Sequence, residues 1–416
     1  MPDAESALPS ARALLRERDY LAFWASRWMG SLGTGIQSVT MGWQVYTISR
    51  RTLSVGASAF NVSLIGLLTF APLFLLALTA GETADRLDRR KVLMICWAGE
   101  IVAVGIIIAA TLSHRASVPL LLAVALLFGA SRAFFQPAST ALGPMLVPRP
   151  LLPRAIAWNS LAGQSASIIG PAAAGVLLAI APVAAYATSL GLYIAAAVCL
   201  LMIRKSGQPV VQPGSRWALV KEGLAYVWQN RIVFGAISLD LAAVILGGAT
   251  ALLPAFARDV LHVGPQGFGI LRAGPALGGA AAAVFLAGRP IRRRAGLVMF
   301  CGVAVYGAAT LVFGFSHALW LSVAALAVLG AADMLSVYVR QTLVQLVTPD
   351  AMRGRVAAVS TLFIGASNEL GEFESGVAAR FLGVVGAAVF GGVGALAVTA
   401  TWAKFFPALR KADRLE

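Results

Sequence analysis

Residues 81–91 read Gly-Glu-Thr-Ala-Asp-Arg-Leu-Asp-Arg-Arg-Lys, and eight of these eleven residues are charged or glycine. Predominantly apolar runs, 57–80 and 92–112, lie on either side of this segment. A helix needs about twenty apolar residues to cross the hydrocarbon core of a bilayer. The pattern therefore predicts two membrane spans that are joined by a short, charged loop.

The composition of the whole chain agrees with this interpretation. Of its 416 residues, 59% are hydrophobic and only 12% are charged, and the mean hydropathy is +0.81. Soluble domains have about 45–50% apolar and about 25% charged residues, so the composition excludes a soluble protein. A net charge of +15 would favour a nucleic-acid partner in a soluble protein, but no basic stripe interleaved with aromatic residues occurs, so we expect no nucleic-acid binding.

The sequence shows neither a cysteine-based site nor a secretory signal peptide. Cys96, Cys199 and Cys301 lie far apart in apolar runs, which offers neither a disulfide framework nor a metal site. The polar first eighteen residues lack the apolar region and cleavage site of a secretory signal peptide. We therefore expect the first span to remain in the mature protein.

The apolar runs predict an all-α integral membrane protein with twelve transmembrane helices. The expected spans lie near 20–47, 57–80, 92–112, 118–144, 156–180, 183–203, 232–257, 266–288, 295–315, 318–346, 356–379 and 384–403. Twelve spans place both termini on one side. The predicted units are an N-terminal segment (1–19), a first half (20–203), a linker (204–231), a second half (232–403) and a tail (404–416).

The distribution of arginine and lysine gives the orientation of these spans. The loops on the side of the termini hold 24 of the 33 basic residues, the opposite loops hold five, and four arginines lie inside spans. Basic residues concentrate in cytoplasmic loops, so both termini are expected to be cytoplasmic. Insertion and contact with anionic membrane lipid then account for the net charge.

An internal repeat supports two pseudo-symmetric six-helix halves. The linker contains a segment, 217–228, that reads as a short helix lying along the interface. Gly81 with 89–91 (Arg-Arg-Lys) recurs as Gly288 with 292–294 (Arg-Arg-Arg), at an offset of about half the chain. Transporters with internal repeats show such an offset.

The charged loop carries a family resemblance. The pattern Gly81-x-x-x-Asp85-Arg86-x-x-Arg89-Arg90-Lys91 resembles the loop signature of the major facilitator superfamily, from which it departs at Asp88, where glycine is commonest. Residues 129–137 (Gly-Ala-Ser-Arg-Ala-Phe-Phe-Gln-Pro) are similar to a second motif of that family. A shifted form of the family's glycine-proline antiporter motif is given by Gly163, Gly170, Pro171 and Gly175.

The resemblance covers nearly every span and is to the bacterial branch of drug and siderophore exporters. It implies a proton-coupled exporter, an antiporter, of amphipathic small molecules. The implied partners are a small-molecule substrate, protons and membrane lipid, without a cofactor or a metal, and the protein is expected to act as a monomer.

The loop motif also has a physical interpretation of its own. Asp85 lies just beyond a predicted helix and can bind the N-terminus of a neighbouring helix or an arginine, and the following cations can hold carboxylate or phosphate partners. These residues are therefore a candidate conformational latch: Gly81, Asp85, Arg86, Arg89, Arg90 and Lys91. In the simpler alternative, which is compatible with the first, the cations only anchor the topology.

Ionisable residues inside spans are the main candidates for function, because each costs about 2.5–3.5 kcal/mol at membrane depth. The chain has ten of them: Arg27, Glu100, Arg132, Asp240, Arg272, Asp333, Arg340, Glu369, Glu372 and Glu374. Six are acidic and four are basic, so pairing leaves two carboxyls that must be protonated, hydrated or paired with a bound cation.

Any proton carrier is expected to be a carboxylate, since no histidine falls in a span. His114, His262 and His317 lie in the arginine-poor loops at unrelated spacings, which does not predict a metal site. The spans place Arg27 and Asp240 at matching depths in the two halves, where they can pair across a cavity.

Two consecutive spans near the C-terminus carry most of the other acidic residues. Asp333 shares a helix face with Arg340, and Glu369 shares one with Glu372, while Glu374 points away. Asp333 and Glu369 have similar depths. If they approach, repulsion and desolvation favour the protonated form of one of them.

We therefore predict that Asp240, Asp333, Glu369 or Glu372 carries the coupling proton, and that Arg132 or Arg27 expels it when substrate binds. The substrate cavity is expected to contain Phe134, Phe135, Gln136, Arg340 and Asn368. Glu100 and Arg272 lie nearer span ends and are expected to be structural. The alternative for every one of these groups is a structural ion pair or packing.

Other functions remain open or are disfavoured. Substrate uptake, or a non-transporting sensor or scaffold on a transporter fold, are the alternatives. An ATP-driven pump is disfavoured because none of the five lysines follows a phosphate-loop pattern. An enzyme is not expected, because no catalytic constellation is evident.

Overall fold

The computed structural model describes residues 11–205, 216–291 and 293–411. Most of the predicted N-terminal segment before Ala11, residues 206–215 of the linker, Arg292 of the recurrent basic motif and residues 412–416 of the tail lie outside the described residues. Long helices dominate the rest, as the apolar runs predict. The fold class is therefore confirmed as an all-helical membrane protein.

The first half contains α2 to α8. After a short α1 (Ala11–Leu14), its elements are α2 (Arg18–Ser49), α3 (Val55–Leu75), α4 (Ala77–Arg86), α5 (Arg89–Leu112), α6 (Val118–Leu142), η1 (Gly143–Leu146), η2 (Arg149–Leu151), α7 (Leu152–Ile180) and α8 (Pro182–Leu201). The linker forms α9 (Arg216–Gln229), close to the predicted interfacial helix.

The second half begins at Arg231. Its elements are α10 (Arg231–Gly247), η3 (Ala249–Leu252), α11 (Leu253–Ala255), η4 (Phe256–Val260), α12 (Gly264–Gly288), α13 (Ala295–Phe315), α14 (Leu319–Val347), α15 (Asp350–Phe405) and α16 (Pro407–Arg410).

Among the described residues, ten helices are long and apolar enough to cross a membrane by length and composition alone. The 32-residue α2, which is more polar, matches the first predicted span. The 56-residue α15 covers the last two predicted spans. It is broken at Gly383, where the backbone leaves the helical region at φ 73° and ψ 170°, so it consists of two helical parts. Counting α2 and the two parts of α15 separately accommodates the twelve predicted spans.

The charged segment that was expected to be a loop is partly helical. Pro72 lies near the end of α3, and the helix is interrupted at Leu76, four residues later. The chain then continues as α4 as far as Arg86, so only Leu87 and Asp88 separate α4 from α5. The predicted turn in water is therefore shorter than the charge pattern indicates.

The seventh predicted span is interrupted in a similar way. The α10 helix ends at Gly247, and at Gly248 a Cβ atom would lie 2.5 Å from the Gly371 backbone, so only glycine fits there. The Tyr306 hydroxyl donates to the Gly247 carbonyl oxygen at 2.9 Å and satisfies an acceptor at the helix end. The chain continues through the turns η3, α11 and η4 to Val260.

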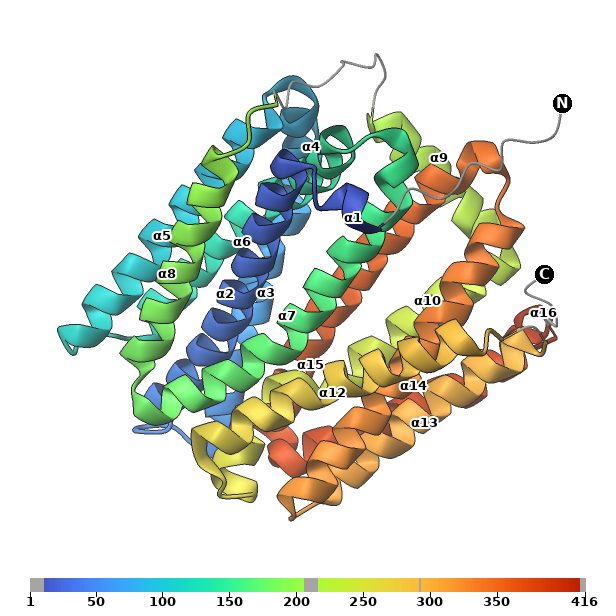
Figure 1. Cartoon of the computed structure of the whole chain (residues 1–416). Coiled ribbons are helices and arrows are strands. Elements are labelled where there is room, and N and C mark those ends of the chain that lie inside the picture. Colours follow the sequence, from blue (N-terminus) through green and yellow to red (C-terminus); the bar gives the residue numbers. More distant parts are fainter. Residues whose placement is uncertain (1–10, 206–215, 292, 412–416) are drawn as a thin grey trace, which may run out of the picture.

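Figure 1 shows two helical bundles that converge at one end and diverge toward the end that carries α4 and α9. We call the diverging end the arginine-rich end, because it carries the α4–α5 junction, and the other the arginine-poor end. Contacts between the bundles are extensive for α3 with α15 and for α7 with α12. They are closest at the arginine-poor end, where Gly175 of α7 crosses Gly269 of α12 and Gly56 of α3 meets Ala379 of α15.

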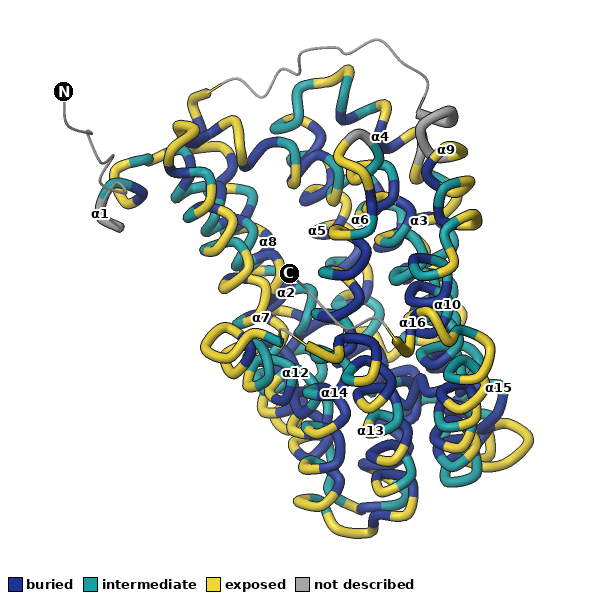
Figure 2. Tube along the Cα trace, turned by 90° about the vertical axis from the view of Figure 1, so that its right-hand side faces the viewer, coloured by how far each residue is buried: buried dark blue, intermediate teal, exposed yellow. Residues whose placement is uncertain are grey.

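The outward faces of the helices are apolar and exposed. Figure 2 shows exposed stretches along the outer sides of many helices. Large apolar side chains such as Ile95, Val284 and Phe381 are at least two-thirds exposed there. In a bilayer these faces contact lipid, which explains why a chain with 59% hydrophobic residues leaves so many of them uncovered.

The crossing of Gly175 and Gly269 yields a prediction about stability. A Cβ atom on Gly269 would lie 2.7 Å from the Gly175 Cα atom, so Gly269→Val must separate α7 from α12. Overpacking of this kind costs about 1–3 kcal/mol. We expect a melting temperature several degrees lower in detergent. Gly191→Val on α8 is the control, because a Cβ there meets no atom within 4 Å. Equal melting temperatures for the two variants would contradict the tight crossing.

Candidate functional site

A cavity of about 550 Å³ lies between the two halves. It is lined by α2, α3, α5, α6 and α7 of the first half and by α12 and α15 of the second half. Six of the ten predicted intramembrane charges line it: Arg27, Glu100, Arg132, Arg272, Glu369 and Glu372. Three positive and three negative side chains therefore surround one space, and we call it the central cavity.

The two halves contribute different charges to the central cavity. The first half supplies Arg27 from α2, Arg132 from α6 and the deeply buried Glu100 from α5. The second half supplies Glu369 and Glu372 from one face of α15, together with Arg272 from α12. Two arginines and one glutamate of the first half therefore face two glutamates and one arginine of the second half, and the cavity keeps these groups out of lipid.

Only one pair of these six groups is in direct ionic contact within the described structure. The Arg272 Nη1 atom lies 3.6 Å from the Glu372 Oε1 atom. Glu369 lies beside Gly66 of α3, where a Cβ atom would come within 2.9 Å of its Oε2 atom. Arg132 lies within electrostatic range of both Glu100 and Glu369, and Arg272 lies within electrostatic range of Glu369 as well. Among the described residues, Glu369 is therefore a carboxylate at the boundary of the halves without a cation in direct ionic contact.

Aromatic side chains form another part of the wall. Trp97 packs edge-on against Phe135, with ring centroids 4.8 Å apart, and stacks on Tyr193 at 5.5 Å. Arg27 lies over the Phe23 ring, 6.0 Å from its centroid. The cavity thus combines charged groups with aromatic surface, which is the usual composition of a site for amphipathic ligands.

The structure changes two of the sequence-based interpretations for this region. Glu100 and Arg272, which were expected to be structural, both line the central cavity because α5 and α12 carry them to its wall. Phe135 and Gln136 line the cavity, whereas the neighbouring Phe134 is not among its lining residues and packs against the apolar core, which Phe135 also contacts. Phe134 therefore lies outside the predicted cavity wall.

The glycine-proline motif lies along α7 between the cavity and its neighbours. Gly163 and Pro171 line the central cavity. Gly170 packs closely on Gly35 of α2, and Gly175 packs on Gly269 of α12. The small residues therefore let α7 approach both halves, which agrees with the predicted packing role.

A second polar cluster lies within the second half. The Arg340 Nη1 atom donates to the Asp240 Oδ2 atom at 2.7 Å, and these side chains are 2% and 7% exposed. This pair replaces the expected contact between Arg27 and Asp240, because α10 and α14 pack together in the same half. Arg340 is consequently buried in the bundle and does not line the central cavity.

Asp333 belongs to this second cluster. It shares a small internal space with Asp240, and it also lines a cavity of about 350 Å³ together with Asn368 and Tyr306. Its charged neighbours are Asp240 and Arg340, whereas Glu369 interacts with Glu372. Asp333 and Glu369 were expected to approach each other because their predicted depths are similar. In the structure they line two different cavities.

Glu374 does not line the central cavity, as its position on the helix predicts. Its Oε2 atom is buried and has no hydrogen-bond partner among the described residues.

The residues of the predicted loop latch bind mainly within the first half. Arg89 donates to the carbonyl oxygens of Ala84 and Ala141, and Arg90 donates to that of Leu201. These hydrogen bonds satisfy backbone carbonyl groups near helix ends. Asp88, where the family pattern has glycine, accepts from the Arg90 backbone N–H at 2.9 Å and caps α5.

A contact between the halves at the arginine-poor end was not singled out from the sequence. The Arg50 Nη2 atom lies 3.0 Å from the Asp259 Oδ1 atom, and the Tyr46 hydroxyl donates to the Asp259 Oδ2 atom. We call Tyr46, Arg50 and Asp259 the α2–η4 bridge. The sequence did contain a signal for this contact. The first and seventh predicted spans hold equivalent positions in the two halves, and that equivalence applies to their ends as well as to the depth of Arg27.

Comparisons with known proteins agree with this architecture. Residues 9–416 match the family model described as transmembrane secretion effector. The chain is 28% identical over 365 residues to the multidrug efflux pump Tap of Mycobacterium tuberculosis, covering 84% of each chain. It is 29% identical over 390 residues to the enterobactin exporter EntS of Citrobacter koseri, covering 91% of this chain and 85% of that protein.

Solved structures share the fold at low sequence identity. The POT family transporter PepTSo superposes with a TM-score of 0.74 at 12% identity, covering 95% of this chain and 99% of the other. A bacterial homologue of the iron transporter ferroportin, in its inward-facing state, superposes with a TM-score of 0.66 at 18% identity, covering 94% and 99%.

The α2–η4 bridge leads to a prediction about local opening. Asp259→Asn removes a partly exposed ion pair that contributes about 1 kcal/mol. We expect backbone amides near η4 to exchange with solvent deuterium about fivefold faster, as measured by mass spectrometry. Arg50→Asp combined with Asp259→Arg is expected to slow this exchange again. Unchanged exchange in Asp259→Asn would show that the bridge does not hold the halves together.

The buried Arg340–Asp240 pair leads to a prediction about stability. Arg340→Gln leaves a buried carboxylate unpaired, which typically costs about 3–5 kcal/mol. We expect a large decrease in the melting temperature, with most of it restored by adding Asp240→Asn. Arg353→Gln is the matched control, because its pair with Asp350 is exposed. A decrease no larger than in that control would refute the structural importance of the buried pair.

Proposed function

Because the chain belongs to the transmembrane secretion effector family of the major facilitator superfamily, we propose that it is a proton-coupled exporter of amphipathic small molecules. The observation that carries the proposal is the central cavity, in which carboxylates of the second half face arginines of the first half. The halves alternate between two tilted arrangements and expose the cavity to one side of the membrane at a time. The protein needs no cofactor for this and acts as a monomer in the bacterial inner membrane.

The arginine-rich end is the cytoplasmic end in this proposal, following the distribution of basic residues. The α2–η4 bridge and the glycine crossings then join the halves on the outer side. Substrate enters the central cavity from the cytoplasm. Export requires the α2–η4 bridge to break while the cytoplasmic ends approach, with the charged residues of the loop latch near the closing surface.

The proposed substrate class follows from the wall of the cavity. Trp97 and Phe135 offer aromatic surface to an apolar body, while Arg27, Arg132 and Glu369 offer charges to its polar groups. Two relatives support the direction of transport, because one is called a multidrug efflux pump and the other an enterobactin exporter. Their different substrates favour a broad class of amphipathic molecules over a single compound.

Glu369 is the proposed carrier of the coupling proton. Glu372 is held by Arg272, which leaves Glu369 as the member of the α15 pair without a cation in direct ionic contact in the described structure. Its protonated form is favoured while the cavity faces outward and Arg132 is distant. When the halves bring Arg132 and substrate closer, the ionised form is favoured and the proton leaves toward the cytoplasm. Asp333, beside Asp240, is a second proton-binding position on the path through the second half.

Substrate-dependent proton movement tests this proposal. We would reconstitute the protein in liposomes with an internal pH dye and add lipophilic cations, siderophores and antibiotics under an imposed proton gradient. We expect proton flux with at least one compound, and a decrease of at least tenfold in Glu369→Gln, because this side chain can no longer exchange a proton.

Glu374→Gln is the matched control, since it makes the same chemical change on the same helix outside the central cavity. Its flux is expected to stay within about twofold of the parent protein. Equal losses in the two variants would refute the specific role of Glu369. Transport without any proton flux would favour facilitated transport, and net uptake under the same gradient would favour the import alternative.

A further inference from the structure

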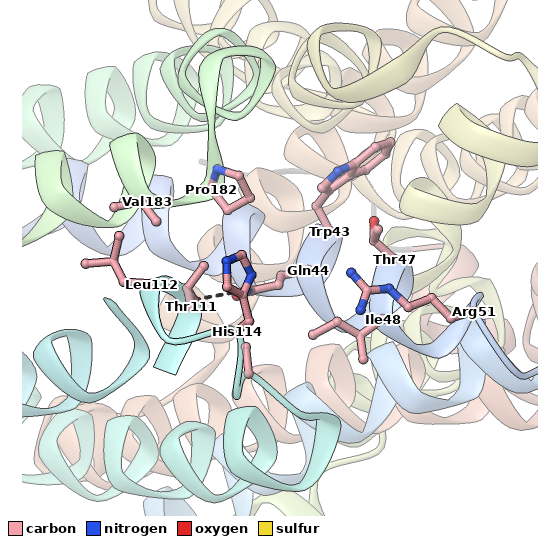
Figure 3. Close-up of a pocket in the computed structure, with 11 residues that line it drawn as sticks. Trp43, Gln44, Thr47, Ile48, Arg51, Thr111, Leu112, His114, Pro182 and Val183 are labelled. Carbon is pink, nitrogen blue, oxygen red and sulfur yellow. Dashed lines mark hydrogen bonds between the residues drawn. The ribbon is translucent and has the colours of Figure 1, made fainter. Parts of the chain in front are cut away.

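A separate pocket of about 410 Å³ opens at the arginine-poor end of the first half. It lies between the last turns of α2 and α5 and the first turn of α8, and none of its lining residues belongs to the central cavity (Figure 3). Its size falls within the range of small-molecule sites, which is about 300–1,000 Å³. The proposed export function does not use this pocket.

Two nitrogen-bearing side chains converge on the pocket. The Arg51 guanidinium extends from the end of α2, and the His114 ring extends from the turn after α5 into the same space (Figure 3). His114 has a left-handed backbone conformation with φ 56°, which non-glycine residues rarely adopt. No carboxylate is among the residues that line this pocket, which distinguishes it from the central cavity.

The neighbouring Arg50 has a different role. It binds Asp259 in the α2–η4 bridge, whereas no ion pair joins Arg51 to any acidic residue in the described structure. A guanidinium that is not paired within the protein remains available to an anionic ligand.

Another polar side chain of the lining, Gln44, is held within the protein. Its amide donates to the Thr111 hydroxyl at 3.0 Å and accepts from the Tyr186 hydroxyl at 2.8 Å. The Thr47 side chain also lines the pocket, but its Oγ1 atom is buried away from the open space. Arg51 and His114 are therefore the side chains that offer charge and hydrogen-bond donors to an occupant.

The remaining walls are apolar. Trp43, Leu112 and Val183 line the pocket, and Trp43 also stacks on Phe268 of the second half with ring centroids 5.5 Å apart. A small inorganic ion would leave these walls in contact with water. They suit a ligand that combines an anionic group with an apolar or aromatic body.

We propose that this pocket binds an organic anion, with a carboxylate or phosphate group between Arg51 and His114 and its apolar part against Trp43. The proposal goes beyond the export function, because it adds a second ligand site outside the central cavity. A free organic anion and an anionic phospholipid both combine an anionic group with an apolar body. Because the pocket lies at the ends of membrane-spanning helices, either of them can reach it. The test separates these two sources.

The charge preference of the pocket is measured with an introduced cysteine. In a background with Cys96, Cys199 and Cys301 changed to alanine, Ala116→Cys places a thiol in the pocket wall. We expect Arg51→Gln to lower the ratio of its reaction rates with sulfonate-bearing and trimethylammonium-bearing methanethiosulfonates at least fivefold. Arg115→Gln, which removes the same charge next to the introduced cysteine but outside the pocket lining, should change it less than twofold. Equal changes in the two variants would overturn the proposal.

Protection by ligands identifies the source of the anion. In nanodiscs of phosphatidylcholine, salicylate should slow reaction of the same cysteine with a neutral methanethiosulfonate at least threefold, whereas the uncharged salicyl alcohol should not. Phosphatidylglycerol nanodiscs should slow it without salicylate if a lipid head group fills the pocket. Either result supports an anion site, provided that Arg51→Gln removes the protection. Protection by neither anion, or protection that persists in Arg51→Gln, would refute it.

Discussion

The cost of placing charged side chains in the hydrocarbon core shapes the interior of this protein. Ten ionisable residues fall in its predicted spans, and lipid solvates none of them well. The fold places nine of them in two environments, and Glu374 lies outside both. Six line a cavity between the halves, where water and opposite charges can reach them, and Asp240, Asp333 and Arg340 form a cluster inside the second half. Keeping both environments intact requires helices that pack closely elsewhere, which the glycine crossings provide.

The two environments differ in how firmly their charges are fixed. Arg340 and Asp240 form a short, buried ion pair within one half, and such a pair survives any movement of one half against the other. Glu369 and Arg132 come from different halves and are not in direct contact, so their separation depends on how the halves are tilted. A group of the second kind can change its protonation state during a conformational cycle, and this is why the proposed coupling site lies in the central cavity.

Much of the fold could be predicted from the sequence because membrane spans depend on local composition. The apolar runs predicted span positions that differ from most of the observed helices by a few residues. Two breaks were missed: the one after Pro72 has a local cause, whereas the one at Gly248 depends on close packing against Gly371. Side-chain partners were harder, because depth along a helix does not say which neighbour a residue faces. Arg27 and Asp240 have matching predicted depths, yet Asp240 pairs with Arg340, and Phe135 lines the central cavity while the adjacent Phe134 does not.

Alternating access around the central cavity is the central claim of this account, and distances at both ends of the molecule test it most directly. Spin labels at Leu53→Cys and His317→Cys report the separation of the halves at the arginine-poor end, and labels at Leu87→Cys and Arg289→Cys report it at the arginine-rich end. Electron–electron double resonance at neutral and acidic pH, with and without a transported compound, should show the first distance lengthening as the second shortens. Distances that stay fixed under every condition, or that change in the same direction at both ends, would contradict the account.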